Sequence, residues 1–128
     1  DEIGLDPDSK LIRYRGRYSQ SNIQNVFCNI DLVIVPSVCK ETFSFITLEA
    51  LSFGIPVLVS SNVGAKDIIS ICNEWFVYSN TEDLKEKLRE ILSDSEILNK
   101  NRQEIKKMDW NFSIEDHCKK MIQLYETI

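Results

Sequence analysis

The sequence predicts an α/β fold in which about four mostly parallel strands form one sheet flanked by helices. Short apolar runs alternate with amphipathic stretches along the chain, which is typical of this fold class. The run at residues 31–36 is continuous and rich in β-branched residues, a pattern that favours a strand covered on both faces. The 128 residues, 43% of them hydrophobic and 27% charged, suffice for one hydrophobic core.

The predicted strands are the apolar runs at residues 11–15, 32–35, 57–60 and 75–78. On the last of them, Trp75, Phe76 and Tyr78 are expected in the core. A first helix is predicted to begin near Ser21, where Gln24 completes the spacing of a capping box. Its expected apolar face comprises Ile23, Val26, Phe27 and Ile30.

The later helices are delimited by their end signals. A second helix is predicted at residues 44–53, because Gly54 suits the position just beyond a helix end. A third follows Gly64 and reaches Ile71, and a fourth begins at Thr81, the expected N-cap. Two more are predicted at residues 95–107 and 113–127, the last with a core face of Ile114, Cys118, Met121, Ile122 and Tyr125.

Charge and cysteine content exclude several classes of function. A net charge of -5 and a pI near 4.9 argue against a surface that binds nucleic acid. No CxxC pair occurs and His117 adjoins Cys118 without a partner at ligand spacing, so no metal site is predicted. We expect Cys28, Cys72 and Cys118 to be small core residues in a reducing compartment.

The connection after the second predicted strand is the first candidate site. Ligands of open parallel sheets bind beyond the carboxyl ends of the strands, where the amides of a helix start can hold a phosphate. This connection carries Glu41, Thr42 and Ser44, and its helix carries Glu49. Glu49 is either a solvated helix position or a carboxylate that binds ligand hydroxyls. Its helix has much apolar surface and no basic residue three or four positions away, which favours the second interpretation.

Gly64 opens the second connection, after the third predicted strand. It either allows a close backbone approach to a ligand or adopts a left-handed turn, and the sequence leaves both open. The chain has no GxSxG elbow, Walker loop or GxGxxG fingerprint, and its single histidine is more typical of a structural residue than of a general acid or base.

Several motifs match one known family. They are Gly16-Arg-Tyr18, the DLVIVPS run at residues 31–37, the ETFSFITLEA run at residues 41–50, and LSFGIPV at residues 51–57 followed by Gly64. Glu41 and Glu49 have the E-x7-E spacing. On these residues the chain resembles, over nearly its whole length after about residue 10, the C-terminal nucleotide-binding lobe of GT-B fold glycosyltransferases, in particular family 4 (group 1) of retaining enzymes. The implied fold is a partial Rossmann-like lobe.

The resemblance implies a role for each matching residue. Glu41 would lie near the transferred sugar as the catalytic carboxylate, and Glu49 would hold the ribose hydroxyls of the nucleotide. The amides of Thr42, Phe43, Ser44 and Phe45 would face the donor diphosphate and sugar, with Gly64 also at the nucleotide-sugar site; Ser44 stands where many relatives have glycine. Such enzymes retain anomeric configuration and use a nucleotide-diphosphate sugar as substrate, without a cofactor or metal.

The resemblance also implies that parts of the family's architecture are missing. Residues 1–128 are expected to be a single partial domain without the lobe's first two strands, their basic pair and the N-terminal lobe that binds a glycan or lipid-linked acceptor. In the family's strand order this leaves a gap in the sheet. We therefore expect rearrangement, self-association through an exposed sheet edge, or incomplete order near residues 1–18.

Two alternatives to a transferase stay open. One is a non-catalytic, transferase-like interaction or regulatory module, and the other is a related GT-B epimerase or phosphorylase. If the chain is part of a transferase, we expect it to lack turnover in isolation because half of the cleft is absent. The expected location is the cytoplasm, or the inner face of a membrane as a peripheral protein, since no apolar run approaches the roughly 20 residues of a membrane helix.

Overall fold

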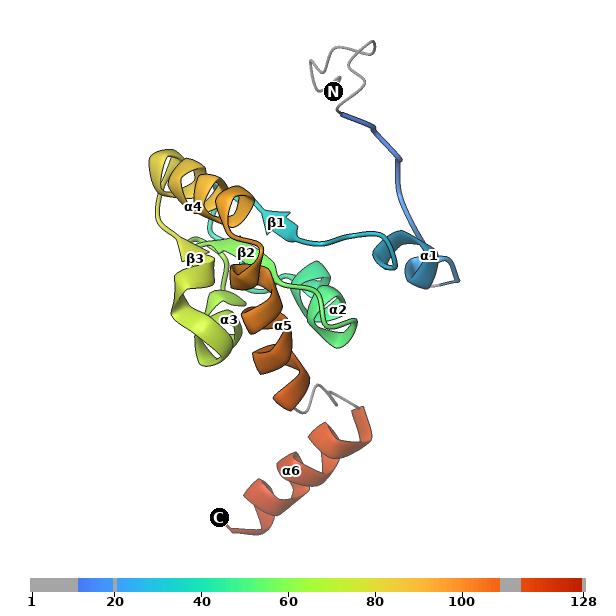
Figure 1. Cartoon of the computed structure of the whole chain (residues 1–128). Coiled ribbons are helices and arrows are strands. Elements are labelled where there is room, and N and C mark those ends of the chain that lie inside the picture. Colours follow the sequence, from blue (N-terminus) through green and yellow to red (C-terminus); the bar gives the residue numbers. More distant parts are fainter. Residues whose placement is uncertain (1–11, 20, 109–113, 128) are drawn as a thin grey trace.

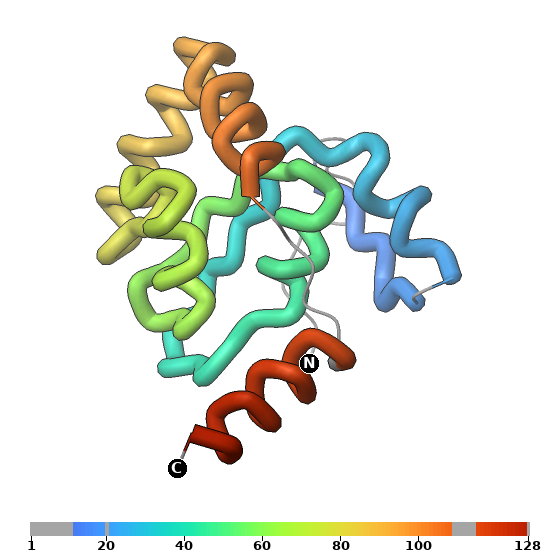
Figure 2. The backbone as a smooth tube through the Cα atoms, turned by 90° about the horizontal axis from the view of Figure 1, so that it is seen from below, coloured from blue at the N-terminus to red at the C-terminus, as the bar shows by residue number. Residues whose placement is uncertain are grey.

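The computed structural model describes residues 12–19, 21–108 and 114–127 of the chain. Figure 1 shows these elements in order: α1 (Ile23–Phe27), β1 (Val33–Val35), α2 (Phe45–Ser52), β2 (Val57–Ser60), α3 (Lys66–Asn73), the 3-10 helix η1 (Glu74–Phe76), β3 (Val77–Tyr78), α4 (Thr81–Ser93), α5 (Glu96–Lys107) and α6 (Ile114–Glu126). In Figure 2, α1 lies at one end of the molecule and α3 and α4 gather at the other, with α2 between them.

The described strands form a parallel sheet in the order β1-β2-β3, which confirms the predicted α/β class. Val33 pairs with Val57 and Val35 with Val59, and Val59 pairs in turn with Val77. Every residue of the central strand β2 is buried. The prediction that the strand at residues 31–36 is covered on both faces is wrong, because β1 lies at the sheet edge and its Ile34 side chain is exposed. Strand β1 stands at one edge, and no other described strand pairs beyond it; self-association through this edge stays a prediction.

Two of the predicted strands are wrong in whole or in part. Residues 12–15 are exposed and belong to no strand, while residue 11 lies outside the described residues. The predicted gap within the sheet is therefore absent, because this segment does not join it. The last strand is only two residues long, because the Asn73 side chain accepts a hydrogen bond from the Trp75 amide and starts a 3-10 turn. Phe76 and Tyr78 are buried as predicted, whereas Trp75 is only partly buried.

Helix α2 has the expected end signals. Gly54 has φ 73°, and its amide donates to the Leu51 carbonyl while the Ile55 amide donates to that of Ala50. These two bonds are the Schellman arrangement, in which a left-handed residue satisfies the last carbonyls of a helix. Thr47, Ala50 and Leu51 form the buried face of α2.

The caps of α1 and α4 differ from the prediction. Ser21 does not cap α1; Asn22 precedes the helix and makes no side-chain capping bond. At α4, the cap is Asn80 instead of Thr81, and its side chain accepts from the amides of Glu82 and Asp83. Asp83 in turn accepts from the Ser79 amide, and chiefly this bond lowers its pKa. Reciprocal bonds of this kind stabilise a helix start.

The closing helices differ in burial. In α5, Ile105 is buried, and Arg102 forms an ion pair with Asp31 at 2.8 Å.

Helix α6 projects away from the sheet in Figure 1. Its predicted core face is wrong, because Cys118, Ile122 and Tyr125 are exposed and only Met121 and Asp116 are partly covered among the side chains described there. Residue 113 and the side chain of Ile114 lie outside the description. No described element packs over this apolar face.

The cysteine prediction is also partly wrong. Cys28 and Cys118 are exposed, and only Cys72 is partly buried; all four thiols are free. Burial, with the charge of Glu104, raises the pKa of Cys72. Within the described ranges, no group of three or more His, Cys, Asp or Glu side chains is placed to hold a metal ion. None of the helices in the same ranges combines the length and apolar character that a membrane crossing requires.

Candidate functional site

Two loops meet at the carboxyl ends of β1 and β2, where an open parallel sheet binds its ligands. The Glu41 amide donates to the Asn62 carbonyl at 3.1 Å, and the Gly64 amide donates to the Glu41 carbonyl at 2.9 Å. Glu41 and Val63 thereby form a parallel bridge outside the main strands. The Asn62 side chain adds bonds to the carbonyls of Ser37 and Val38. These bonds hold the loop that carries Glu41 against the loop that carries Gly64.

Gly64 is explained by close backbone approach. Its φ is not in the left-handed region, where Gly16 and Gly54 lie among the described glycines. A Cβ at Gly64 would lie 2.1 Å from the carbonyl oxygen of Thr42 and 2.9 Å from its carbonyl carbon. The left-handed interpretation is therefore wrong, and a close approach to a ligand stays a prediction. The group that approaches Gly64 is the backbone of the other loop.

Glu41 lies at the exposed rim of this loop. The Ser37 hydroxyl donates a hydrogen bond to Glu41 Oε1, which fixes one carboxylate oxygen near the end of β1. No other described group is bonded to its Oε2. A carboxylate with one oxygen engaged can accept further bonds from sugar hydroxyls.

The start of α2 provides amides beside Glu41. Ser44 precedes the helix in an extended conformation, and its side chain makes no capping hydrogen bond. Ser44 is buried, whereas Thr42, Phe43 and Phe45 are exposed, and the two phenylalanine rings contact edge to face at 5.6 Å. The Thr47 amide donates to the Ser44 carbonyl at 3.1 Å. The amides of Phe45 and Ile46 have no partner among the described groups and carry the partial positive charge of a helix start. This turn is therefore suited to an anion such as phosphate.

Glu49 lies one turn further along α2 and has a partner that the sequence did not predict. The Tyr18 hydroxyl donates to Glu49 Oε2 at 2.5 Å. Burial, this hydrogen bond and the Glu49 charge raise the pKa of Tyr18 to about 12. The Tyr18 ring packs edge-on against Phe27, 6.0 Å between centroids, and Phe27 stacks on Phe53 at 5.3 Å.

The predicted site residues fall into two groups. Glu41, Thr42 and Gly64 are in direct contact, and Ser44 and Phe45 continue from them into α2. Glu49 shares that helix, but the bonds described for its side chain lead to Tyr18 and not to Glu41. Whether these residues bind a donor stays a prediction.

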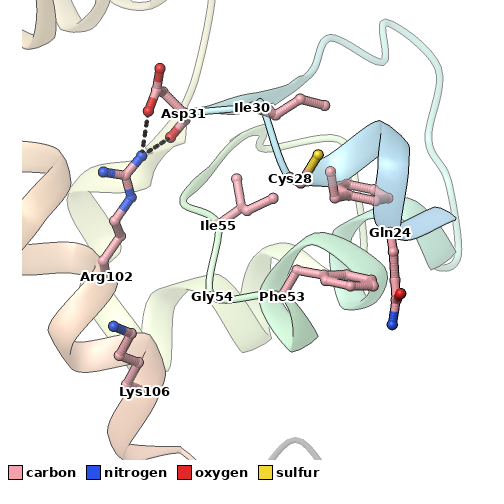
Figure 3. Close-up of a pocket in the computed structure, with 10 residues that line it drawn as sticks. Gln24, Cys28, Ile30, Asp31, Phe53, Gly54, Ile55, Arg102 and Lys106 are labelled. Atoms are coloured by element: carbon pink, nitrogen blue, oxygen red, sulfur yellow. Dashed lines mark hydrogen bonds and ion pairs between the residues drawn. The ribbon is translucent and has the colours of Figure 1, made fainter.

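A cavity lies elsewhere in the fold. It has a volume of about 440 Å³ and lies at the amino ends of β1 and β2, beside Asp31, Gly54 and Ile55. Figure 3 shows Arg102 and Lys106 of α5 on one side of it and Phe53, Cys28 and Gln24 on the other. None of the predicted site residues lines it. The Arg102–Asp31 pair in its wall joins α5 to the segment before β1.

Comparison with known proteins identifies the family. Residues 9–108 match the family described as glycosyl transferases group 1. The chain belongs to this family. No solved structure matches the chain.

Two curated relatives of this group 1 chain illustrate the likeness. A sulfoquinovosyl transferase of Arabidopsis thaliana is 32% identical over 106 residues, which are 76% of this chain and 21% of that protein. An uncharacterized glycosyltransferase of Methanocaldococcus jannaschii is 30% identical over 83 residues, 63% of this chain and 21% of that protein. The group 1 chain thus spans about a fifth of the length of these relatives.

Sequence reasoning missed three residues of this candidate site: Tyr18, Ser37 and Asn62. Tyr18 and Ser37 both lie inside the motifs on which the resemblance rests, and that position could have marked them as candidate site residues. Their partners were not predictable, because Tyr18 bonds a residue 31 positions away and Asn62 bonds carbonyls 24 and 25 positions away. Hydrogen bonds between residues so far apart in the sequence depend on how the folded chain brings their segments together.

Alkaline titration tests the Tyr18–Glu49 contact. We expect Tyr18 to ionise near pH 12, and Glu49→Gln to return its pKa toward the ordinary 10.0 by removing the negative charge. Because the folded-state pKa is raised, the stability that Tyr18 contributes is present below pH 10 and is lost as the pH rises from 10 to 12. Phenolate absorbance, with Tyr18→Phe to identify the signal and Glu41→Gln as control, measures this. Ionisation of Tyr18 at pH 10 in the unmodified chain would contradict the contact.

Proposed function

We propose that this chain supplies the donor-binding half of a retaining glycosyltransferase that takes a sugar from a nucleotide-diphosphate sugar. Membership of group 1 supports sugar transfer as the activity. The observation that carries the proposal is the juxtaposition of Glu41, held through its loop against Gly64, with the uncapped first turn of α2. It combines an acceptor of hydroxyl hydrogen bonds with a set of amides suited to a diphosphate.

Each group has a role in the proposal. The donor diphosphate lies at the first turn of α2, where the helix amides stabilise the charge that develops as the diphosphate departs. Glu49 lies about 6 Å along the helix axis from Phe45, given a rise of about 1.5 Å per residue. Its carboxylate accepts hydrogen bonds from the ribose hydroxyls. Glu41 accepts bonds from the sugar and stabilises positive charge near the reacting carbon, and the proposal requires no metal or cofactor.

The acceptor and the location are also part of the proposal. The acceptor is a glycan or a lipid-linked sugar, bound by a lobe outside these 128 residues. We place the protein in the cytoplasm or at the inner face of a membrane as a peripheral protein. The four free thiols support a reducing compartment.

Calorimetric titration with UDP, GDP and ADP, and with UDP-sugars, tests the donor half. We expect one nucleoside diphosphate to bind and Glu49→Ala to weaken it by about tenfold or more, since hydrogen bonds to a charged group contribute about 1.5–3 kcal/mol. Glu86→Ala, an exposed acid on α4, is the matched control.

Four other results would count against the proposal. Failure of every nucleotide to bind a folded chain would show that this half-site is insufficient. Binding that Glu49→Ala leaves unchanged would remove Glu49 from the site. Binding without sugar transfer in a full-length protein that contains this chain would favour the non-catalytic module. Epimerisation or phosphorolysis by that protein would favour the related GT-B epimerase or phosphorylase.

A further inference from the structure

The carboxylate of Glu49 has no basic residue near it on its own helix. It lies in α2, whose opposite face is buried, and the residues three and four positions away are Phe45, Ile46, Ser52 and Phe53. None of these can neutralise a carboxylate. Its charge is thus not compensated from its own helix. The hydrogen bond from Tyr18 is the only one that the described residues make to this carboxylate.

The ring of Tyr18 is held independently of that bond. It contacts Phe27 edge to face, and Phe27 stacks on Phe53, one turn after Glu49 on the same side of α2. Two contacts therefore link Tyr18 to one helix face: the hydroxyl to Glu49 and the ring, through Phe27, to Phe53. Loss of the hydroxyl alone would leave the aromatic contacts in place.

We propose that Tyr18 is a positioning residue that holds Glu49 Oε2, so that Oε1 is presented to the vicinal hydroxyls of a bound nucleoside. The inference rests on the proposed function. It adds that Tyr18, by holding Glu49, makes the site prefer a nucleotide whose ribose carries both hydroxyls. A glutamate side chain that is free to rotate loses conformational entropy when it binds, and a pre-formed hydrogen bond reduces that cost.

The geometry favours positioning over blocking. A carboxylate has about four lone-pair sites, and the Tyr18 hydroxyl occupies one of them on Oε2. Oε1 has no partner among the described groups. The phenol stays neutral up to strongly alkaline pH, so it remains a donor and leaves the negative charge of Glu49 in place. Two hydroxyl donors of a diol can therefore bind beside it.

Paired ligands with and without the diol test the inference. UDP, GDP and ADP are titrated against the unmodified chain, Tyr18→Phe and Glu49→Gln, each beside its 2′,3′-dideoxy counterpart. We expect the unmodified chain to prefer the ribose form by about tenfold or more, because the dideoxy form lacks both hydroxyls that would donate to Glu49. Tyr18→Phe should lower this preference by about threefold to tenfold, leave the dideoxy affinity unchanged, and have no further effect in the Glu49→Gln background. Tyr14→Phe, an exposed tyrosine of the same segment, is the control.

The possible outcomes separate the inference from the proposed function. If Glu49→Gln abolishes the diol preference and Tyr18→Phe retains it, Tyr18 has no positioning role and the proposed function stands. If neither variant alters the preference, Glu49 does not bind the ribose, and both proposals fail. Tighter binding of the ribose form by Tyr18→Phe would show that Tyr18 competes with the ligand, which overturns the inference. Absence of nucleotide binding by the folded chain overturns both.

Discussion

Replacement of Gly64 by alanine is expected to lower the free energy of unfolding by about 3 kcal/mol and to displace the Glu41 loop. The added Cβ would lie 2.1 Å from the carbonyl oxygen of Thr42, and this neighbour is backbone, which cannot rotate away. Inserting extra atoms into a well-packed site commonly costs about 1–3 kcal/mol, and we expect a clash this close to cost an amount at the upper end of that range. Urea unfolding measures the stability, and nucleotide titration measures the effect on the site.

Gly54 provides the matched control, because its environment is open and only its φ of 73° is restrictive. Gly54→Ala is expected to cost about 1 kcal/mol, and Gly54→Asn less, since asparagine adopts left-handed conformations more readily. At position 64 we expect the opposite order: Gly64→Asn should lower the free energy of unfolding at least as much as Gly64→Ala. Equal, small losses for Gly64→Ala and Gly54→Ala would show that the two loops do not approach as described.

Replacement of Phe76 by alanine is expected to produce the largest loss of stability, about 3–5 kcal/mol, because it removes a large buried ring and leaves a cavity. Phe76 is 1% exposed and precedes the short strand β3. Native domains of this size are stable by only about 5–15 kcal/mol, so this substitution should remove a large fraction of the free energy of unfolding. Chemical denaturation followed by circular dichroism measures this.

Phe45 is the control of the same residue type, since 76% of it is exposed. Phe45→Ala should change the free energy of unfolding by no more than about 0.5 kcal/mol. The large difference between the two substitutions follows from burial alone. A loss below about 1 kcal/mol at Phe76 would contradict its place in the core.

Much of the central fold followed from local sequence signals. The β-branched run around Val33–Val35 and the apolar run at Val57–Ser60 are strands where predicted, and α2 ends at Gly54 as expected. These elements are encoded by short-range patterns, namely side-chain periodicity and the conformation of one glycine, which tertiary contacts reinforce. The family assignment rested on the same region and is confirmed.

Weaker local signals failed where a competing contact was available. Thr81 appeared to be the cap of α4, but the Asn80 side chain reaches two amides of the first turn. The run at residues 75–78 appeared extended throughout, but the Asn73 side chain starts a tighter turn. At α6, amphipathic spacing predicted the helix correctly but gave no information on whether another element covers it.

The sequence by itself determined the parallel α/β class, the family and the residue types available to the candidate site. Only the tertiary structure decided how those residues combine: Gly64 is a glycine because the backbone of Thr42 passes beside it, and Glu49 is bonded by Tyr18. The physical reason is the range of the interactions. Periodicity and capping act within a few residues, whereas these contacts arise only when segments distant in the sequence are brought together by folding.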